Sequence, residues 1–164
     1  MNKAVFFDRD GVINDDPGDY TYLLEEFKIN DGVISSLKKL SSEGYLLFII
    51  TNQGGISKKI YTHNHVNAIH KYLIEELAKE NVKLSEIYYC PHHNVNENCL
   101  CRKPNSLLIE KAIARFNIDK EKSFMIGDKP RDVEAAENAG VKGIKVGVNE
   151  NIEKYVDDIL NSNY

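Results

Sequence analysis

Short apolar runs alternate along the chain with longer stretches in which apolar residues recur every three or four positions. Short runs are typical of buried strands, and the three-to-four spacing is typical of amphipathic helices. The pattern predicts strands at residues 4–8, 45–51, 86–90, 123–128 and 143–148. It predicts helices at residues 33–43, 64–80, 106–116, 131–138 and 152–160.

Strands that alternate with helices in this way predict βαβ units and a mainly parallel sheet. Right-handed crossovers would place helices on both faces of that sheet. The expected fold class is therefore α/β, with three layers and a doubly wound topology. The 164 residues fit a single domain that covers positions 1–164.

Polar residues follow three of the predicted strands. Asp8 ends the first, Thr51 and Asn52 end the second, and Asp128 ends the fourth. Open α/β sheets bind ligands beyond the carboxyl ends of their strands. We therefore expect these side chains to line one crevice.

Two acidic residues stand close together at the end of the first strand. In extended chain, residues i and i+2 share a face, so Asp8 and Asp10 are expected to point together and Arg9 to point away. Neighbouring carboxylates repel each other unless a cation lies between them, and Asp128 would complete an oxygen site suited to magnesium. The alternative is a solvated turn, which the other polar strand ends make less attractive.

Basic residues would have to offset this acidic centre before a phosphate could bind. Arg102 and Lys103 precede a predicted helix. Lysine supplies a compact positive charge for a phosphoryl oxygen, and arginine a bidentate fork. Thr51 and Asn52 can add neutral donors. The alternative for the two basic residues is ordinary surface charge.

Three cysteines and two adjacent histidines form a second cluster. Its members are Cys90, His92, His93, Cys99 and Cys101. Three thiolates and one imidazole make a closed tetrahedral site for structural zinc, in a loop at about residues 90–101. Cys90, His92, Cys99 and Cys101 are the expected ligands, with His93 as the alternative to His92. Buried or surface thiols without metal are the other interpretation.

Composition limits the classes of partner. A net charge of −4 gives no electrostatic footprint for nucleic acid or an anionic membrane. No apolar run approaches the roughly 20 residues of a membrane-spanning helix. The first residues lack the features of a signal peptide. We expect a monomeric cytoplasmic protein that acts on a small molecule.

Four ordered motifs carry a family resemblance across nearly the whole chain. They are Asp8-Arg9-Asp10-Gly11-Val12, Thr51-Asn52-Gln53, Lys103 and Gly127-Asp128-Lys129-Pro130-Arg131-Asp132. Together they resemble the haloacid dehalogenase (HAD) superfamily. Phosphatases of that superfamily are Mg²⁺-dependent and form an aspartyl-phosphate intermediate.

The resemblance implies a role for each matching residue. Asp8 would be the nucleophile, Asp10 the general acid and then base, and Thr51 and Lys103 the phosphoryl-binding residues. Magnesium would be held by Asp8, the backbone carbonyl of Asp10, and Asp128. Asp10 must be protonated to assist the leaving group, and the negative charge of its neighbours is expected to raise its pKa. A residue further along, Asp132, is expected to support the site or the start of its helix.

The cysteine loop narrows the resemblance to one branch of the superfamily. Cys-Pro-His at residues 90–92 and Cys-Leu-Cys-Arg-Lys-Pro at 99–104 are similar to phosphatases of D-glycero-D-manno-heptose 1,7-bisphosphate and of histidinol phosphate. The former serve lipopolysaccharide or surface-sugar precursor synthesis. The branch has no large cap domain, and this chain leaves no room for one. Recognition would come from loops at 15–22 and 53–59 and from the zinc loop.

The expected substrate is the heptose bisphosphate, with hydrolysis of its 7-phosphate. A bisphosphate needs positive charge for its second phosphate, which Arg102, Lys129, Lys58 and Lys59 could supply. The predicted substrate-binding residues are Asn52, Gln53, Arg102, Lys129, Lys58, Asp16 and Tyr20.

Two alternatives remain at this point. Histidinol phosphate carries an ammonium group, which Asp15, Asp16 or Asp19 could bind, although these acids could equally bind sugar hydroxyls. The short zinc loop also resembles the histidinol type. The non-enzyme alternative is an inactive module that binds a phosphorylated metabolite, against which the presence of both Asp8 and Asp10 argues.

Overall fold

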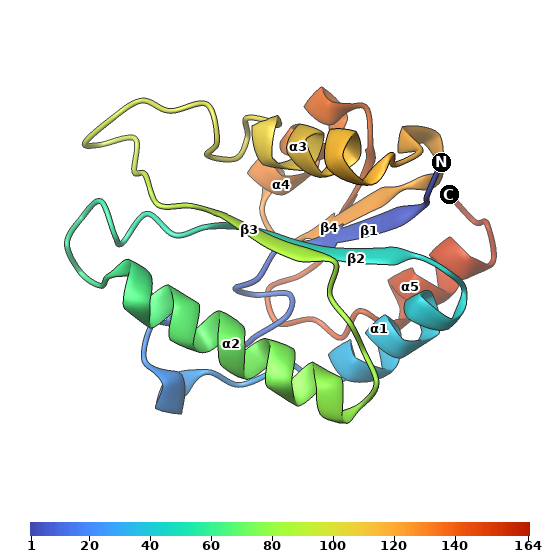
Figure 1. Cartoon of the computed structure of the whole chain (residues 1–164), viewed down its shortest axis with the longest axis horizontal. Coiled ribbons are helices and arrows are strands. Elements are labelled where there is room, and N and C mark those ends of the chain that lie inside the picture. The colour runs from blue at the N-terminus through green and yellow to red at the C-terminus, as the bar shows by residue number, and fades with distance from the viewer.

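A computed structural model describes all residues 1–164 and contains one five-stranded parallel sheet (Figure 1). The strand order is β3-β2-β1-β4-β5, and every neighbouring pair is parallel. The strands are β1 (Ala4–Phe7), β2 (Leu46–Asn52), β3 (Glu86–Cys90), β4 (Phe124–Gly127) and β5 (Lys142–Lys145). The predicted parallel α/β sheet is confirmed.

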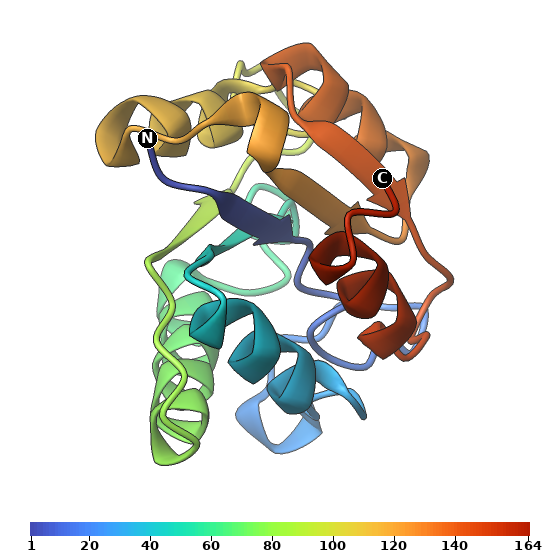
Figure 2. The same ribbon diagram turned by 90° about the vertical axis from the view of Figure 1, so that its right-hand side faces the viewer.

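Helices cover both faces of the sheet, which gives the three expected layers (Figures 1 and 2). One face carries α1 (Val33–Ser42), α2 (His63–Lys79) and α5 (Glu153–Leu160), and the other carries α3 (Leu107–Phe116) and α4 (Pro130–Ala139). Two short 3₁₀ helices that the sequence pattern did not predict are η1 (Leu24–Glu26) and η2 (Lys120–Lys122). No large cap is inserted among these elements.

The first strand explains why its sequence is a continuous apolar run. Val5 and Phe7 pack into the core on the side of α1, α2 and α5, whereas Ala4 and Phe6 pack into the core beneath α3 and α4. All four are fully buried. A parallel strand covered on both faces has no solvent side, so alternation of polar and apolar residues is absent.

The strand order places a topological switch point between β1 and β4. The chain leaves β1 through α1 on one face toward β2, and leaves β4 through α4 on the other face toward β5. The two connections diverge, and a crevice opens at the carboxyl ends of both strands. Asp8 follows β1 and Asp128 follows β4, so both lie at this crevice.

The last predicted strand is too long at its carboxyl end. It was expected at residues 143–148, but β5 ends at Lys145. The chain turns there because the backbone N–H of Gly147 donates to Glu150 Oε2 at 2.6 Å. This turn brings Asn149 back to the crevice, where its backbone N–H donates to the carbonyl of Gly11 at 2.8 Å.

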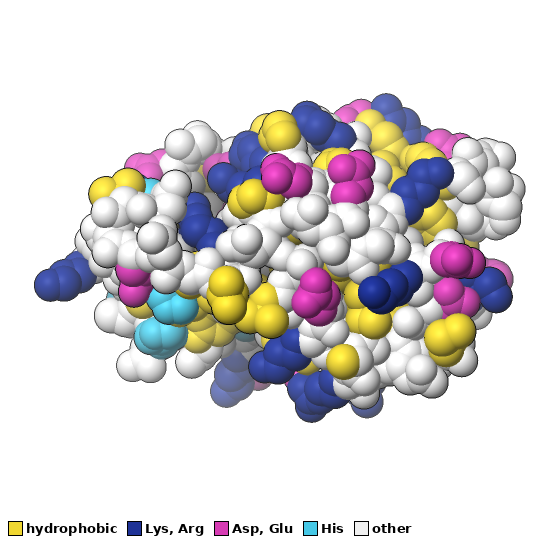
Figure 3. Space-filling view, turned by 90° about the horizontal axis from the view of Figure 1, so that it is seen from above, with side chains coloured by type: hydrophobic (Ala, Val, Ile, Leu, Met, Phe, Trp, Pro, Cys, Tyr) yellow, Lys and Arg dark blue, Asp and Glu magenta, His cyan; other side chains and the backbone are white.

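Charged side chains of both signs share the surface. On the face seen in Figure 3, Lys and Arg side chains are interspersed with Asp and Glu. Among the helices, none has both the length and the apolar character required to cross a membrane. The monomeric state and the cytoplasmic location stay predictions.

Candidate active site

The centre of the crevice is a buried ion cluster built from three distant parts of the chain. Lys103 Nζ lies 2.8 Å from Asp8 Oδ1 and 2.8 Å from Asp132 Oδ1. The same ammonium donates to the carbonyl of Ile50 at 2.6 Å, and the backbone N–H of Arg9 donates to Asp8 Oδ1 at 2.8 Å. Asp8, Lys103 and Asp132 are each at most 5% exposed. One lysine therefore bridges two carboxylates that water barely reaches.

Burial is the largest single influence on the pKa values of Asp8 and Lys103. It raises the pKa of Asp8 to about 7, against the opposing charge of Lys103 and with the added repulsion of Asp132 and Asp10. Burial also disfavours the ammonium of Lys103, but Asp8 and Asp132 outweigh that effect and raise its pKa above the ordinary value. Lys103 is therefore a permanent positive charge in the crevice.

The same end of the sheet offers oxygen ligands for a divalent cation. Carboxylate oxygens of Asp8, Asp128 and Asp132 lie within 4.8 Å of one another. Asp128 Oδ1 is buried without a hydrogen-bond partner, and the backbone carbonyl of Asp10 accepts no hydrogen bond within the chain. Unpaired buried oxygens require a partner, and hard oxygen donors suit magnesium. The residues present fit this ion.

Gly11 is required by the close approach of the loop to Asp128. Its φ is +86°, and a Cβ at this position would lie 2.7 Å from Asp128 Oδ2. Any other residue would be strained in this conformation and would also displace the carboxylate. The turn after β1 thus brings the backbone of Gly11 against the carboxylate that follows β4.

Arg9 does not point away from the site, contrary to prediction. It is fully buried, and its Nη2 donates to Asp10 Oδ1 at 2.8 Å and to the carbonyl of Thr21 at 3.0 Å. The alternation of a strand stops at Phe7, where β1 ends. Beyond it the backbone N–H groups of residues 12–14 all donate to the carbonyl of Arg9, so the chain turns and Arg9 faces inward.

The expected rise in the pKa of Asp10 is also wrong. Burial acts to raise this pKa, but the guanidinium of Arg9 and hydrogen bonds from Arg9, Asn14 and Gln53 lower it below its ordinary value. Asn14 Nδ2 donates to Oδ1 at 3.0 Å and Gln53 Nε2 to Oδ2 at 2.9 Å. The neighbouring negative charge on which the prediction rested is outweighed, and Asp10 is a carboxylate in the free site.

The polar side chains at the end of β2 form hydrogen bonds mainly with other residues of the protein. Gln53 Nε2 also donates to Thr51 Oγ1 at 2.8 Å, and its Oε1 accepts from the hydroxyl of Tyr61 at 2.7 Å. Asn52 forms two hydrogen bonds with the backbone of Lys103, at 3.0 and 3.1 Å. These contacts fix Asp10 and Lys103 relative to β2. Substrate binding by Asn52 and Gln53 stays a prediction.

A polar cavity of about 460 Å³ is lined by Asp10 and by the chain neighbours of the ion cluster, Arg102 and Arg131. Six of the seven predicted substrate-binding residues line it: Asp16, Tyr20, Asn52, Gln53, Arg102 and Lys129. Lys58 is the exception. Its side chain is exposed and its Nζ lies 5.7 Å from the ring centroid of Tyr20, outside the lining.

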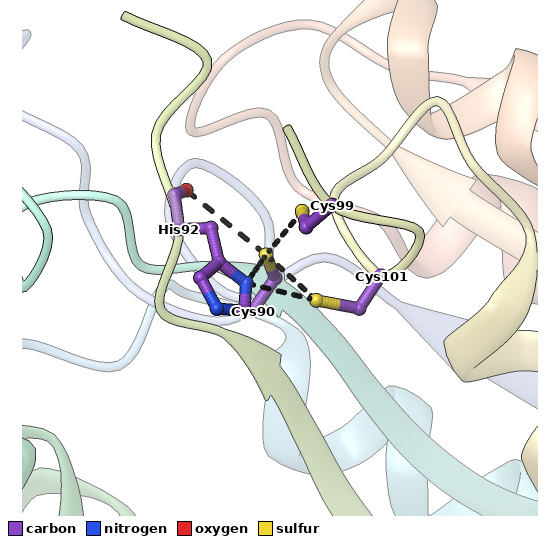
Figure 4. A group of neighbouring side chains, drawn as sticks. All are labelled: Cys90, His92, Cys99 and Cys101. Carbon is purple, nitrogen blue, oxygen red and sulfur yellow. Dashed lines mark hydrogen bonds between the residues drawn. The ribbon is translucent and has the colours of Figure 1, made fainter. Parts of the chain in front are cut away.

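The cysteine loop gathers the four predicted zinc ligands, as Figure 4 shows. Cys90 Sγ lies 3.1 Å from Cys101 Sγ and 3.6 Å from Cys99 Sγ, and His92 Nδ1 lies 3.3 Å from Cys101 Sγ. His93 is not part of the cluster, because its ring lines the cavity and its Nδ1 accepts from the backbone of Val95. The structure thus separates two histidines that the sequence could not.

The ligand atoms of the cysteine cluster fit a tetrahedral zinc ion. All four lie within 4.8 Å of one another, and three sulfurs with one nitrogen is a ligand set typical of structural zinc. Burial acts to raise the pKa of the Cys99 thiol, but hydrogen bonds from the backbone of Arg102 and Cys101 lower it to about 7. A thiolate is therefore accessible at neutral pH.

Comparisons with known proteins agree with this geometry. A family described as HAD-hydrolase-like matches residues 100–158. The chain is 42% identical to D-glycero-beta-D-manno-heptose-1,7-bisphosphate 7-phosphatase of Haemophilus influenzae, over 87% of this chain and 79% of that protein. It is 40% identical to the corresponding alpha-heptose phosphatase of Campylobacter jejuni, over 90% and 83%. The chain belongs to the heptose-bisphosphate phosphatase family of HAD hydrolases.

A solved structure shows the same fold for this HAD phosphatase. The D,D-heptose 1,7-bisphosphate phosphatase of B. bronchiseptica, in complex with magnesium and phosphate, superposes with a TM-score of 0.90. The two chains are 25% identical, and the match covers 98% of this chain and 99% of the other.

Several residues of the phosphatase site were missed by sequence reasoning. Tyr61 follows no recognised motif, and only the structure shows that it holds Gln53. Arg131 also lines the cavity. Its position inside the fourth motif, one residue before Asp132, was the available signal, but no role was assigned to it.

Proposed function

We propose that this phosphatase removes the 7-phosphate of D-glycero-D-manno-heptose 1,7-bisphosphate through a phosphorylated Asp8. One observation carries the chemistry: a buried aspartate with its lysine lies at the switch point of the sheet, close in the chain to Asp10, which lines a polar cavity. The names of the relatives support the substrate.

Asp8 acts in the first displacement. Its Oδ1 is held by Lys103 and by the backbone N–H of Arg9, whereas Oδ2 accepts no hydrogen bond from the chain. Oδ2 attacks the phosphorus, and the bond between phosphorus and the sugar oxygen breaks. Asp10 gives its proton to that leaving oxygen. The incoming phosphate adds negative charge beside Asp10 and raises its pKa, so Asp10 takes up this proton from solvent when the substrate binds.

Asp10 acts as a base in the second displacement. It takes a proton from a water molecule, whose oxygen attacks the phosphorus. The bond from phosphorus to Asp8 breaks, which releases inorganic phosphate and restores the Asp8 carboxylate. Asp10 holds the proton taken from water and loses it to solvent once the phosphate leaves, which restores its carboxylate. The low pKa of Asp10 in the free site suits this role, because the carboxylate is the resting form.

Asp8, Asp128 and the backbone carbonyl of Asp10 would hold Mg²⁺, which when bound offsets the negative charge of the phosphoryl group. Lys103 supplies a second positive charge, 2.8 Å from Oδ1 of Asp8. Thr51 lies at the end of β2, where its backbone and hydroxyl can bind the remaining phosphoryl oxygens.

Zinc bound by Cys90, His92, Cys99 and Cys101 would fix the loop that leads into Arg102 and Lys103. The set is closed, so no position is left for a reacting water. Its role in this proposal is structural: it fixes the loop through which Arg102 reaches the cavity.

The test is phosphate release with magnesium, from heptose 1,7-bisphosphate and histidinol phosphate offered separately at equal concentration. We expect kcat/KM for the bisphosphate to be higher by at least about tenfold. A preference for histidinol phosphate would overturn the substrate assignment and leave the chemistry at Asp8 in place. Full activity after removal of all divalent cations would overturn the magnesium site.

A further inference from the structure

Arg131 is a cation without an acidic partner at the edge of the active-site cavity. No carboxylate lies within 4.0 Å of its guanidinium, and its Nε is buried without any hydrogen-bond partner. A buried donor that the protein leaves unpaired costs free energy unless a ligand or water satisfies it. Arg131 is therefore arranged for an acceptor that the chain does not supply.

Arg102 faces the same cavity and also lacks an acidic partner. Its Nη1 donates to the backbone carbonyl of His92 at 3.0 Å, which orients the guanidinium and leaves its positive charge unpaired. Both arginines line the main cavity, and both line a neighbouring groove of about 290 Å³. Arg102 and Arg131 therefore lie where the cavity and the groove meet.

The ion cluster below fixes these two arginines near one another. Arg102 directly precedes Lys103, Arg131 directly precedes Asp132, and Lys103 Nζ lies 2.8 Å from Asp132 Oδ1. Consecutive Cα atoms are only about 3.8 Å apart, so this buried pair also fixes the positions of its chain neighbours. Lys103 and Asp132 point toward the nucleophile, whereas Arg102 and Arg131 face the cavity.

Among the other charged residues of the lining, Asp10, Asp16 and Lys129 are already paired, and Asp19 accepts only the backbone N–H of Tyr20. Asp10 is held by Arg9, and Lys129 Nζ lies 2.7 Å from Asp128 Oδ2 and 3.9 Å from Asp16 Oδ2. The uncompensated positive charge on the lining is therefore that of the two arginines. Two guanidinium forks are the arrangement that binds a phosphate through several parallel hydrogen bonds.

We propose that Arg131, together with Arg102, binds the phosphate of the substrate that is not cleaved. This inference rests on the proposed function, because it requires a substrate with two phosphates. Of the four predicted residues, it keeps Arg102 and replaces Lys58, Lys59 and Lys129 with Arg131 at the start of α4. It also makes the site unfavourable for the ammonium group of histidinol phosphate.

The test compares heptose 1,7-bisphosphate with heptose 7-phosphate, which lacks the second phosphate, in the wild type and in Arg131→Gln. We expect the variant to lose about 10- to 100-fold in kcat/KM on the bisphosphate, mainly through KM, and far less on the monophosphate. Arg131→Lys should recover part of the loss, because it restores the charge without the fork.

Arg115→Gln is the matched control, since Arg115 lies on α3 and pairs with Glu86 outside the cavity. It should leave both substrates unaffected. Equal losses on both substrates in Arg131→Gln, or a selective loss in Lys58→Gln but not in Arg131→Gln, would overturn the inference. A wild type that prefers histidinol phosphate would instead overturn the proposed function, and the inference would fall with it.

Discussion

The ion cluster at the strand ends and the cysteine loop are held in place by different means. Asp8, Lys103 and Asp132 come from separate parts of the chain. They are fixed by the packed sheet, which has a hydrophobic core on each face. The rest of the cysteine loop is largely outside those cores, with Val95 76% and Leu100 75% exposed. Only its base is anchored, by Cys90 in one core, by Cys99 and Cys101 packed against that core, and by the contacts among the four ligand atoms.

As a result, the residue that binds the transferred phosphoryl group and the residue that binds the rest of the substrate are anchored separately. Lys103 is secured by Ile50, Asn52 and Asp132, none of which belongs to the cysteine loop. Arg102 is secured by the carbonyl of His92, which belongs to the metal cluster. Disordering the loop should therefore displace Arg102 more than Lys103. The predictions below test this separation.

The largest effect is expected at the nucleophile. Asp8→Asn keeps the size of the side chain but cannot form the phosphorylated intermediate, so phosphate release should fall on the order of a thousandfold or more. The variant should fold and retain its zinc, because the loop is built independently. Circular dichroism, metal analysis and steady-state kinetics check these points, with the exposed Asp31→Asn as control. Wild-type turnover in Asp8→Asn would refute the mechanism.

Loss of the metal cluster should affect recognition more than chemistry. We expect about one zinc per chain and fewer than about one titratable thiol in the native protein. Cys101→Ser should lose the zinc and about tenfold or more in kcat/KM for the bisphosphate, with a smaller loss on p-nitrophenyl phosphate, which does not need Arg102. Equal losses on both substrates would show that the loop supports Lys103 as well, contrary to the separation.

The fold and three of the four motif positions were predictable because they depend on periodic burial and on strand ends, whereas the role of Lys103, in the loop before α3, was implied by the family resemblance. Continuous apolar runs identified the parallel strands, and the carboxyl ends of β1, β2 and β4 then had to meet. The cysteine cluster was predictable from spacing alone. Each of these features follows from local sequence and from the general geometry of α/β sheets.

The errors fall where tertiary contacts override a local rule. Arg9 was expected outside because strand alternation was extended beyond Phe7, the end of β1, as far as Asp10. The pKa of Asp10 was then assigned the wrong direction, because the buried guanidinium beside it was not foreseen. His92 and His93 could not be distinguished, since only the path of the loop decides which ring meets the sulfurs.

A smaller effect, on stability, should link magnesium to pH through Asp8. Burial raises its pKa from the ordinary 3.8 to about 7, so between these values the folded metal-free protein holds a proton that the unfolded chain lacks. The stability of the metal-free protein therefore falls as pH rises across that range. Magnesium requires the carboxylate, so its binding below pH 7 must displace this proton.

We consequently expect magnesium to raise Tm more at pH 8 than at pH 6, as measured by thermal unfolding with and without the ion. Asp8→Asn has no proton to displace and should show a smaller, flatter dependence. An equal rise in Tm at both pH values in the wild type would mean that Asp8 is already ionised at pH 6. The raised pKa would then be wrong for the protein in solution.

The smallest effect is expected at Tyr61, which reaches Asp10 only through Gln53. Tyr61→Phe removes the hydroxyl that donates to Gln53 Oε1 at 2.7 Å and leaves a buried acceptor unpaired, at a cost of about 1 to 2 kcal/mol. Gln53 Nε2 would then hold Asp10 less firmly, and kcat should fall a few-fold with little change in KM.

Tyr155→Phe is the control, since the hydroxyl of Tyr155 donates a hydrogen bond to Glu150 at 3.0 Å, away from the site. If both variants lose stability but only Tyr61→Phe loses kcat, the hydrogen bonds from Tyr61 to Asp10 act as one positioning chain. If kcat is unchanged in both, Asp10 is positioned by Arg9 and Asn14 alone.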